Sequence, residues 1–173
     1  MRDRFDDFVA QRLDRLLRYA TALTCDPHLA QDVVQETLLR AQHRWERIAG
    51  LQAPESYVRK MITNEFLSWR RRKASRNVTA AHSTLDAIGT PTADHAEHYA
   101  ERDAMRARIA ALPRKQRAAI VLRFYEDCTD AEIAEALGCS AGTVRSHISR
   151  ALSTLRAADG GRRRGLPVTE ALS

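Results

Sequence analysis

Residues that favour turns are few in this chain, and aromatic side chains are scarce. Its 173 residues include 7 glycines, 5 prolines and only 6% aromatic residues. Low glycine and proline content disfavours a turn-rich all-β fold, whereas abundant Ala, Leu, Arg and Glu favour helices. Because hydrophobic residues still make up 44% of the chain, aliphatic side chains and alanine must supply most of a packed core. The composition therefore predicts an all-α protein.

Disulfide frameworks, export signals and membrane spans are also missing from the sequence. The cysteines Cys25, Cys128 and Cys139 are far apart and odd in number, so we expect reduced thiols that act as small hydrophobic residues. The N-terminal sequence MRDRFDDFVAQRL lacks the apolar centre of a signal peptide. No apolar run is long enough to cross a membrane. We therefore expect a cytoplasmic protein with no membrane association.

Positive charge exceeds negative charge, with 28 Lys and Arg residues against 22 Asp and Glu residues and a net charge of +6. Lysine occurs only at Lys60, Lys73 and Lys115, so nearly all the basic residues are arginine. The arginine fork matches phosphate groups and guanine edges. The balance favours a nucleic-acid partner, although a soluble basic protein from a GC-rich genome would have the same composition.

Apolar residues recur at three- and four-residue spacing in separate segments. These segments predict helices at about 3–23, 27–48, 55–72, 97–111, 114–125, 129–137 and 141–157. Residues 74–96 show no helical period and are rich in small polar residues, which predicts a flexible linker. The sequence thus predicts two small helical domains, at 1–73 and 97–157, followed by a basic flexible tail at 158–173.

The most specific local pattern begins at Thr129. Thr129 and Glu132 form a capping box at the start of one predicted helix, and Gly138 supplies the left-handed residue that ends it. Val144 on the next helix fills the gap between the two helices, and Ala134 leaves room for their close crossing. This spacing is typical of a DNA-binding helix-turn-helix, although an ordinary helical hairpin with a solvated polar face is the alternative.

Polar side chains on the outward face of the second helix of this pair are candidates for DNA contact. Arginine can bind guanine through two hydrogen bonds, and serine can reach base edges or phosphates. Arg145 and Arg150 are the best candidates for reading bases, while His147 either contacts phosphate or is simply exposed. The predicted contact residues are Thr143, Arg145, Ser146, Ser149 and Arg150.

The predicted helix at 55–72 mixes basic and aromatic residues. Such a mixture suits single-stranded DNA, whose bases stack on rings while its phosphates meet cations. Two simpler explanations stay open: aromatic residues at helical spacing belong to a core, and a basic run is favoured at the C-terminus of a helix. The residues with this potential include Arg59, Lys60, Trp69, Arg70 and Arg71.

Acidic and amide side chains cluster near the start of the predicted helix at 27–48. The cluster contains Asp32, Gln35 and Glu36. On a basic protein such a patch can dock a protein partner, but acidic residues are also favoured near the N-terminus of any helix. The pattern by itself favours neither explanation.

Two blocks of this sequence resemble a known family. The segments DPHLAQDVVQETLLRAQHRW and PESYVRKMITNEFLSWRRRK resemble the promoter-melting domain, σ2, of extracytoplasmic-function sigma factors. The segment LPRKQRAAIVLRFYEDCTDAEIAEALGCSAGTVRSHISRAL is similar to their σ4 domain, most closely to that of the SigE-like actinobacterial group. The resemblance covers about residues 5–72 and 97–157, and the order of the two blocks across a linker makes it more specific than either block alone.

The resemblance implies an RNA polymerase sigma factor that directs promoter-specific initiation of transcription. It implies that Asp32, Gln35 and Glu36 dock on the clamp helices of the polymerase β′ subunit. The loop at about 46–56 matches the loop that captures a flipped base of the −10 element, and Asn64 matches a polar residue that lines its pocket. Extruding a base costs a few kcal/mol, which pocket hydrogen bonds and contacts with the strand must offset.

The σ4 block implies contacts farther upstream on the promoter. Arg145, Ser146, Ser149 and Arg150 match positions that face the −35 element. The partners implied are core RNA polymerase, through its β′ clamp helices and β flap, and promoter DNA, with an anti-sigma factor as a further candidate partner.

Two other classes of protein are less consistent with the sequence. A stand-alone helix-turn-helix regulator would need a dimerisation element, but the chain has no heptad seam, and the acidic patch would be unexplained. The chain has no Gly-rich phosphate loop, no HExxH and no nucleophile elbow, so we predict no enzymatic activity, no catalytic residue and no cofactor. His95 and His98 lack further ligands nearby in sequence, so no metal site is predicted either.

Overall fold

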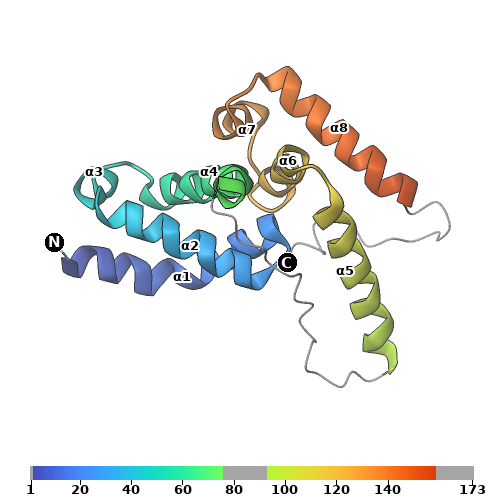
Figure 1. Cartoon of the computed structure of the whole chain (residues 1–173), viewed down its shortest axis with the longest axis horizontal. Coiled ribbons are helices and arrows are strands. Elements are labelled where there is room, and N and C mark those ends of the chain that lie inside the picture. Colours follow the sequence, from blue (N-terminus) through green and yellow to red (C-terminus); the bar gives the residue numbers. More distant parts are fainter. Residues whose placement is uncertain (1, 76–92, 159–173) are drawn as a thin grey trace.

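The computed structural model describes residues 2–75 and 93–158, and it describes side chains within 4–68 and 100–157. All regular elements in these ranges are helices, which confirms the predicted all-α class. Figure 1 shows the first four helices on one side of the molecule and the last four on the other. In chain order the helices are α1 (Arg2–Thr24), α2 (Pro27–Gln42), α3 (Trp45–Ala49), α4 (Pro54–Ser75), α5 (Ala93–Ala111), α6 (Arg114–Phe124), α7 (Asp130–Leu137) and α8 (Ala141–Ala158).

The start of α2 follows from local capping. The Asp26 carboxylate accepts hydrogen bonds from the backbone N–H groups of His28, at 2.9 Å, and Leu29, at 3.2 Å. Pro27 occupies the first helical position, where its missing N–H costs no hydrogen bond. Just before this cap, Cys25 has a φ of 55°, which turns the chain sharply between α1 and α2.

One predicted helix is divided in two. We predicted a single helix at 27–48, but α2 ends at Gln42 and α3 begins at Trp45, with Arg44 at φ −121° and ψ 17° between them. The break accompanies the burial of Trp45, whose ring centroid lies 5.2 Å from that of Phe5 and 4.7 Å from that of Phe8. The apolar period continues through the break, so the sequence contains no signal for it.

Helix α5 begins earlier than we predicted. It starts at Ala93 rather than near Glu97, so the last residues of the predicted linker at 74–96 are helical. The first two residues of that linker, Ala74 and Ser75, belong to the end of α4. Residues 76–92 of the predicted linker and residues 159–173 of the predicted tail lie outside the described part of the chain.

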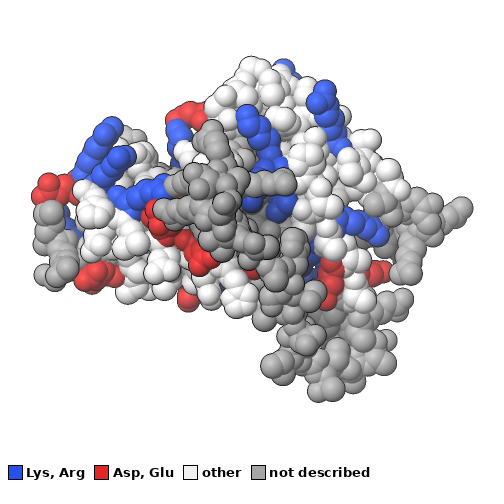
Figure 2. All heavy atoms as spheres, in the orientation of Figure 1, with Lys and Arg blue, Asp and Glu red and all other residues white. Residues whose placement is uncertain are grey.

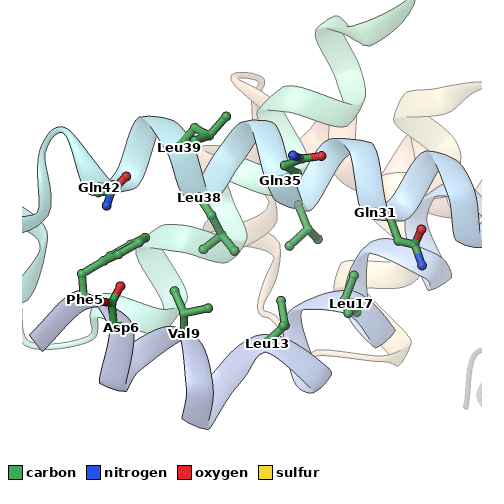
Figure 3. A pocket seen from close by; sticks show the side chains of 11 residues that line it. Phe5, Asp6, Val9, Leu13, Leu17, Gln31, Gln35, Leu38, Leu39 and Gln42 are labelled. Carbon is green, nitrogen blue, oxygen red and sulfur yellow. The ribbon is translucent and has the colours of Figure 1, made fainter. Parts of the chain in front are cut away.

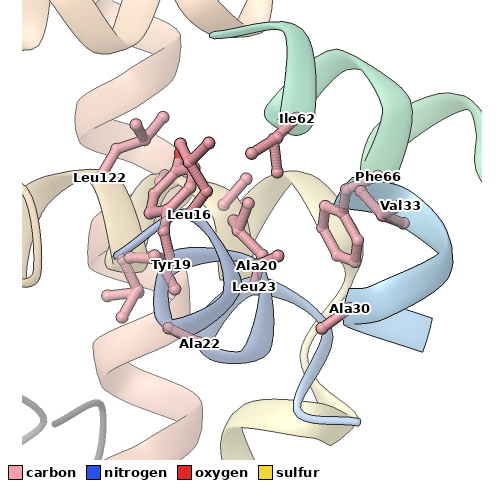
Figure 4. Packing of buried hydrophobic residues seen from close by; sticks show 14 of the residues in the cluster. Leu16, Tyr19, Ala20, Ala22, Leu23, Ala30, Val33, Ile62, Phe66 and Leu122 are labelled. Carbon is pink, nitrogen blue, oxygen red and sulfur yellow. The ribbon is translucent and has the colours of Figure 1, made fainter. Parts of the chain in front are cut away.

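Buried side chains of α1, α2 and α4 form the core of the N-terminal half (Figure 4). The phenol of Tyr19 is fully buried, and its oxygen lies 2.7 Å from the hydroxyl of Thr63. Burial raises the pKa of Tyr19 far above its usual range, so the phenol stays protonated. Other buried residues of this core include Leu16, Ala20, Leu23, Val33, Ile62 and Phe66.

The core continues from the N-terminal helices into α6. Leu122 of α6 lies beside Leu16 and Tyr19 in Figure 4, and the rings of Tyr19 and Tyr125 are 6.3 Å apart. The Arg117 guanidinium, on α6, donates hydrogen bonds to the carbonyls of Leu23, at 3.3 Å, and Thr24, at 3.0 Å. These carbonyls end α1 and have no partner within their own helix, so Arg117 caps α1 from the other half of the molecule.

Candidate functional site

Helices α7 and α8 form the helix-turn-helix that the sequence predicts. The Thr129 hydroxyl accepts a hydrogen bond from the Glu132 N–H at 3.3 Å, and the Glu132 carboxylate accepts one from the Thr129 N–H at 2.7 Å. The latter bond lowers the pKa of Glu132. Gly138 has a φ of 62°, and the Ser140 hydroxyl caps α8 by accepting from the Thr143 N–H at 3.1 Å. Val144 is fully buried between the two helices.

All the predicted contact residues of α8 are exposed. Thr143 and Ser146 nevertheless have partners within the helix: the Thr143 hydroxyl lies 2.9 Å from that of Ser140, and the Ser146 hydroxyl donates to the Gly142 carbonyl at 3.1 Å. Arginine side chains are longer than these hydroxyl side chains, and Arg145 Nη1 lies 3.2 Å from Asp130 Oδ2 of α7. The exposed residues are Thr143, Arg145, Ser146, Ser149 and Arg150.

His147 is not simply exposed, which is one of the two alternatives that the sequence leaves open. Its side chain is half-buried, and its Nδ1 atom is buried with no hydrogen-bond partner in the described part of the chain. Burial lowers the pKa of His147, and the positive charges of Lys115 and Arg150 lower it further. The imidazole is therefore neutral at neutral pH.

The two described basic candidates of α4 face the C-terminal helices. Arg59 forms an ion pair with Glu126, which follows α6, and Lys60 Nζ lies 2.5 Å from a carboxylate oxygen of Glu135 on α7. Burial raises the pKa of Glu126, although Arg59 opposes that shift. The sequence contained no sign of these pairs, because their partners lie far along the chain.

The other candidates of α4 lie farther along the helix. Asn64 is exposed on α4. Trp69, Arg70 and Arg71 belong to the last turns of the helix, where their side chains lie outside the described residues.

The loop predicted at 46–56 is shorter in the structure. Residues 46–49 belong to α3, and α4 begins at Pro54, so only residues 50–53 lie between the two helices. Leu51 in this connection is 40% exposed, which is unusual for a large apolar side chain of this molecule.

The predicted acidic patch lies on the outer face of α2. Asp32 and Gln35 are exposed and Glu36 is half-buried. Glu36 forms an ion pair of 2.7 Å with Arg40, which also reaches Glu65 of α4 at 2.6 Å. Sequence reasoning missed Arg40, although its four-residue spacing from Glu36 is a signal for such a pair.

An open apolar groove runs between α1 and α2 beside this patch (Figure 3). It has a volume of about 410 Å³, and Leu39 on its edge is 51% exposed. Val9, Leu13 and Leu17 of α1 line it, and each of them is only partly buried. The apolar face of α1 is wider than the surface that α2 covers, so part of it stays accessible. The α2 residues that line the groove are Gln31, Val34, Gln35, Leu38, Leu39 and Gln42.

Charge is unevenly spread over the face seen in Figure 2. Lys and Arg side chains lie mostly in the upper half of that view, and most Asp and Glu side chains lie lower. The three cysteines are free and half-buried. Within the described residues, no helix is long and apolar enough to cross a membrane.

Comparison with known proteins identifies both halves of the chain. Residues 8–76 match the family model for Sigma-70 region 2, and residues 102–155 match that for Sigma-70 region 4. The chain is 38% identical over 152 residues to the RNA polymerase sigma-E factor of Streptomyces coelicolor, covering 88% of this chain and 84% of that protein. It is 35% identical over 160 residues to the ECF RNA polymerase sigma factor SigL of Mycobacterium tuberculosis, covering 90% and 86%.

A solved structure has the same fold. The sigma factor RpoE of Bartonella quintana, in complex with the anti-sigma factor NepR, superposes with a TM-score of 0.67 at 23% identity, covering 94% of this chain and all of that one. Regions 2 and 4 occur together in one chain, which shows a sigma factor rather than a stand-alone regulator. The chain belongs to the extracytoplasmic-function family of RNA polymerase sigma factors.

Proposed function

We propose that this sigma factor binds core polymerase and promoter DNA through two different faces of the molecule. Residues 1–73 dock on core polymerase and open the −10 element, and residues 97–157 read the −35 element. The observation that carries the proposal is the separation of α8 from α2, which lie on opposite sides of the molecule in Figure 1, each with exposed polar side chains. A single chain can therefore hold polymerase and upstream DNA at the same time.

Docking on the β′ clamp helices uses Asp32, Gln35 and Glu36 in this proposal. The adjacent groove between α1 and α2 supports it, because an accessible apolar surface with a polar rim is typical of a protein-binding site. Leu39 supplies an exposed apolar anchor at the edge of the groove. Arg40 holds Glu36 in place, so the carboxylate is already oriented before the partner arrives.

Helix α8 reads the −35 element, and its N-terminal turns enter the major groove as in other helix-turn-helix proteins. Arg145 and Arg150 contact base edges. The hydroxyls of Thr143, Ser146 and Ser149 lie on the same exposed face, where they reach phosphates or bases at shorter range.

Opening of the −10 element requires a rearrangement. Arg59 and Lys60 are paired with Glu126 and Glu135, so both cations must exchange a carboxylate for a phosphate before they can contact the single strand. We propose that the two halves separate when polymerase binds, which frees both cations. Asn64 and the connection around Leu51 then receive the extruded base, and Trp69, Arg70 and Arg71 continue the contact with the strand.

The same rearrangement explains how a regulator could act. The similar structure of RpoE is a complex with an anti-sigma factor, which supports the proposal that a partner of this class holds our chain in its closed arrangement. Once released from such a partner, the protein acts in the cytoplasm, with polymerase on the nucleoid. Its C-terminal half contacts the β flap of the polymerase. The protein has no catalytic activity of its own.

The test separates the two faces by mutation. Arg145→Ala should lower promoter-specific initiation by reconstituted holoenzyme while leaving the affinity for core polymerase unchanged. The pair Asp32→Ala and Gln35→Ala should do the reverse, weakening core binding measured by fluorescence anisotropy. Loss of core binding in Arg145→Ala, or unaltered core affinity in the double variant, contradicts the division of labour.

A further inference from the structure

Asp130, the first residue of α7, holds two arginines from the neighbouring helices. Its Oδ2 accepts a hydrogen bond from Arg145 Nη1 of α8 at 3.2 Å, and its Oδ1 accepts one from Arg123 Nη2 on the last turn of α6. One carboxylate thus joins the three helices that build the helix-turn-helix. We propose that Asp130 is a positioning residue for promoter recognition, which orients the Arg145 guanidinium toward a base of the −35 element. This inference rests on the proposed function, because it requires Arg145 to read a base.

The guanidinium of Arg145 is held at one edge and accessible at the other. The Arg145 side chain is 67% exposed, whereas that of Asp130 is 29% exposed, so the pair is partly shielded from solvent at the carboxylate. A Cβ atom added at Gly142 would lie 3.9 Å from Arg145 Nη2, which places this side chain along the first turn of α8. A guanidinium has five N–H donors, so one edge can bind Asp130 while others face guanine O6 and N7.

Fixing this arginine before DNA arrives has a physical advantage. A free arginine side chain samples many rotamers, and that freedom is lost when it contacts a base. Holding the side chain beforehand reduces the entropy lost on binding, and it favours the base that suits the fixed geometry.

The second pair of Asp130 offers a matched control. Arg123 is 31% exposed and belongs to α6, so its ion pair with Asp130 ties α6 to α7 within the scaffold. The Arg145 pair instead reaches the exposed face of α8. A purely structural role of Asp130 would depend on the Arg123 pair, whereas a role in recognition depends on the Arg145 pair.

The experiment uses holoenzyme reconstituted from the full chain and core polymerase. Selection from a random duplex library defines the −35 sequence that the wild type prefers, and affinities for that duplex and its single-base variants then give the preference at each position. Asp130→Ala should reduce the preference at the position read by Arg145 by about two- to fivefold, the range for an exposed ion pair. Asp130→Asn keeps one acceptor and should retain part of the preference. In an Arg145→Ala background, Asp130→Ala should have no further effect.

Each result supports or overturns a distinct statement. Arg123→Gln should leave the base preference unchanged. If Arg145→Ala abolishes a preference that Asp130→Ala leaves intact, the role of Asp130 is overturned while the proposed function stands. If Asp130→Ala and Arg123→Gln both lower the Tm and weaken all duplexes equally, Asp130 is structural and the inference is again overturned. If Arg145→Ala changes no preference, the proposed function itself fails.

Discussion

Arg40 connects the outer face of α2 to the interior of the N-terminal half. It pairs with Glu36, whose side chain is 44% exposed, and with Glu65, whose side chain is 2% exposed. Taking a carboxylate out of water costs free energy, which hydrogen bonds and a nearby opposite charge must offset. The two pairs of one arginine therefore contribute unequally to stability.

This inequality can be measured. Arg40→Met removes the cation from Glu65 and should lower the free energy of unfolding by about 1.5–3 kcal/mol, the range for hydrogen bonds to charged groups. Glu36→Gln removes only the exposed pair and should change it by less than about 1 kcal/mol. Urea unfolding of the full chain measures both. Equal losses in the two variants would contradict the ranking by burial.

His147 makes stability depend on pH in a definite direction. Burial lowers its pKa in the folded protein, whereas in the unfolded chain the imidazole titrates near its ordinary pKa of about 6.5. Between these two values the unfolded state binds more protons, so its contribution to stability is complete above about pH 6.5 and falls as pH drops through the folded pKa. His147→Gln should therefore flatten the pH dependence of the unfolding free energy below neutrality. Parallel curves for the variant and the wild type would rule out this role.

Residues that act through near neighbours in sequence were predictable. Thr129, Glu132 and Gly138 were predicted and are found in their roles, because a capping box and a left-handed helix end depend on a few adjacent residues. The pairs of Asp130 with Arg145 and of Arg40 with Glu65 were missed. Each joins side chains 15 or 25 residues apart, so packing of the helices decides which charges meet.

At the scale of elements, the turn between α7 and α8 depends on one backbone conformation. Gly138 has a φ of 62°, and a Cβ added there would meet no atom within 4 Å. Gly138→Ala should therefore destabilise the chain through backbone strain alone, by about 1–2 kcal/mol. The matched control is Gly50→Ala at the end of α3, where φ is −80° and the nearest atoms to an added Cβ are 3.7 Å away.

Urea unfolding of both glycine variants tests this assignment. Gly50→Ala should be close to neutral, because neither strain nor a clash opposes it. If the two substitutions cost the same, the left-handed conformation of Gly138 is not what the turn requires.

Helix ends were predictable where a local cap sets them and not where tertiary packing does. Asp26 and Pro27 set the start of α2 within three residues of sequence. The break before α3 instead follows the packing of Trp45 on Phe5 and Phe8, which belong to another helix. The same reasoning explains the groove beside α2, since the helical spacing in residues 3–23 shows which residues are apolar but not which of them a neighbour covers.

At the scale of the whole molecule, the sequence predicted two domains but not the contact between them. That contact combines the apolar packing of α6 on α1 with the cap that Arg117 places on the end of α1. Ion pairs of Arg59 and Lys60 lie beside it. All of these contacts join residues from different halves of the chain, so no local sequence pattern predicts them.

The ion pairs at this contact should set how readily the halves separate. Glu126→Gln leaves the half-buried Arg59 without an anion, while Glu135→Gln removes a pair in which Glu135 is 75% exposed. We expect Glu126→Gln to shift the equilibrium toward the open form by about ten- to a hundredfold, from the worth of a hydrogen bond to a charged group, and Glu135→Gln to have little effect. Small-angle scattering of the isolated chain measures this as an increase in the radius of gyration, which should be largest in the variant that carries both substitutions.

High salt should expand the wild type less than the double substitution does, because screening weakens the exposed pair more than the half-buried one. A double variant as compact as the wild type would mean that apolar packing of α6 alone keeps the molecule closed.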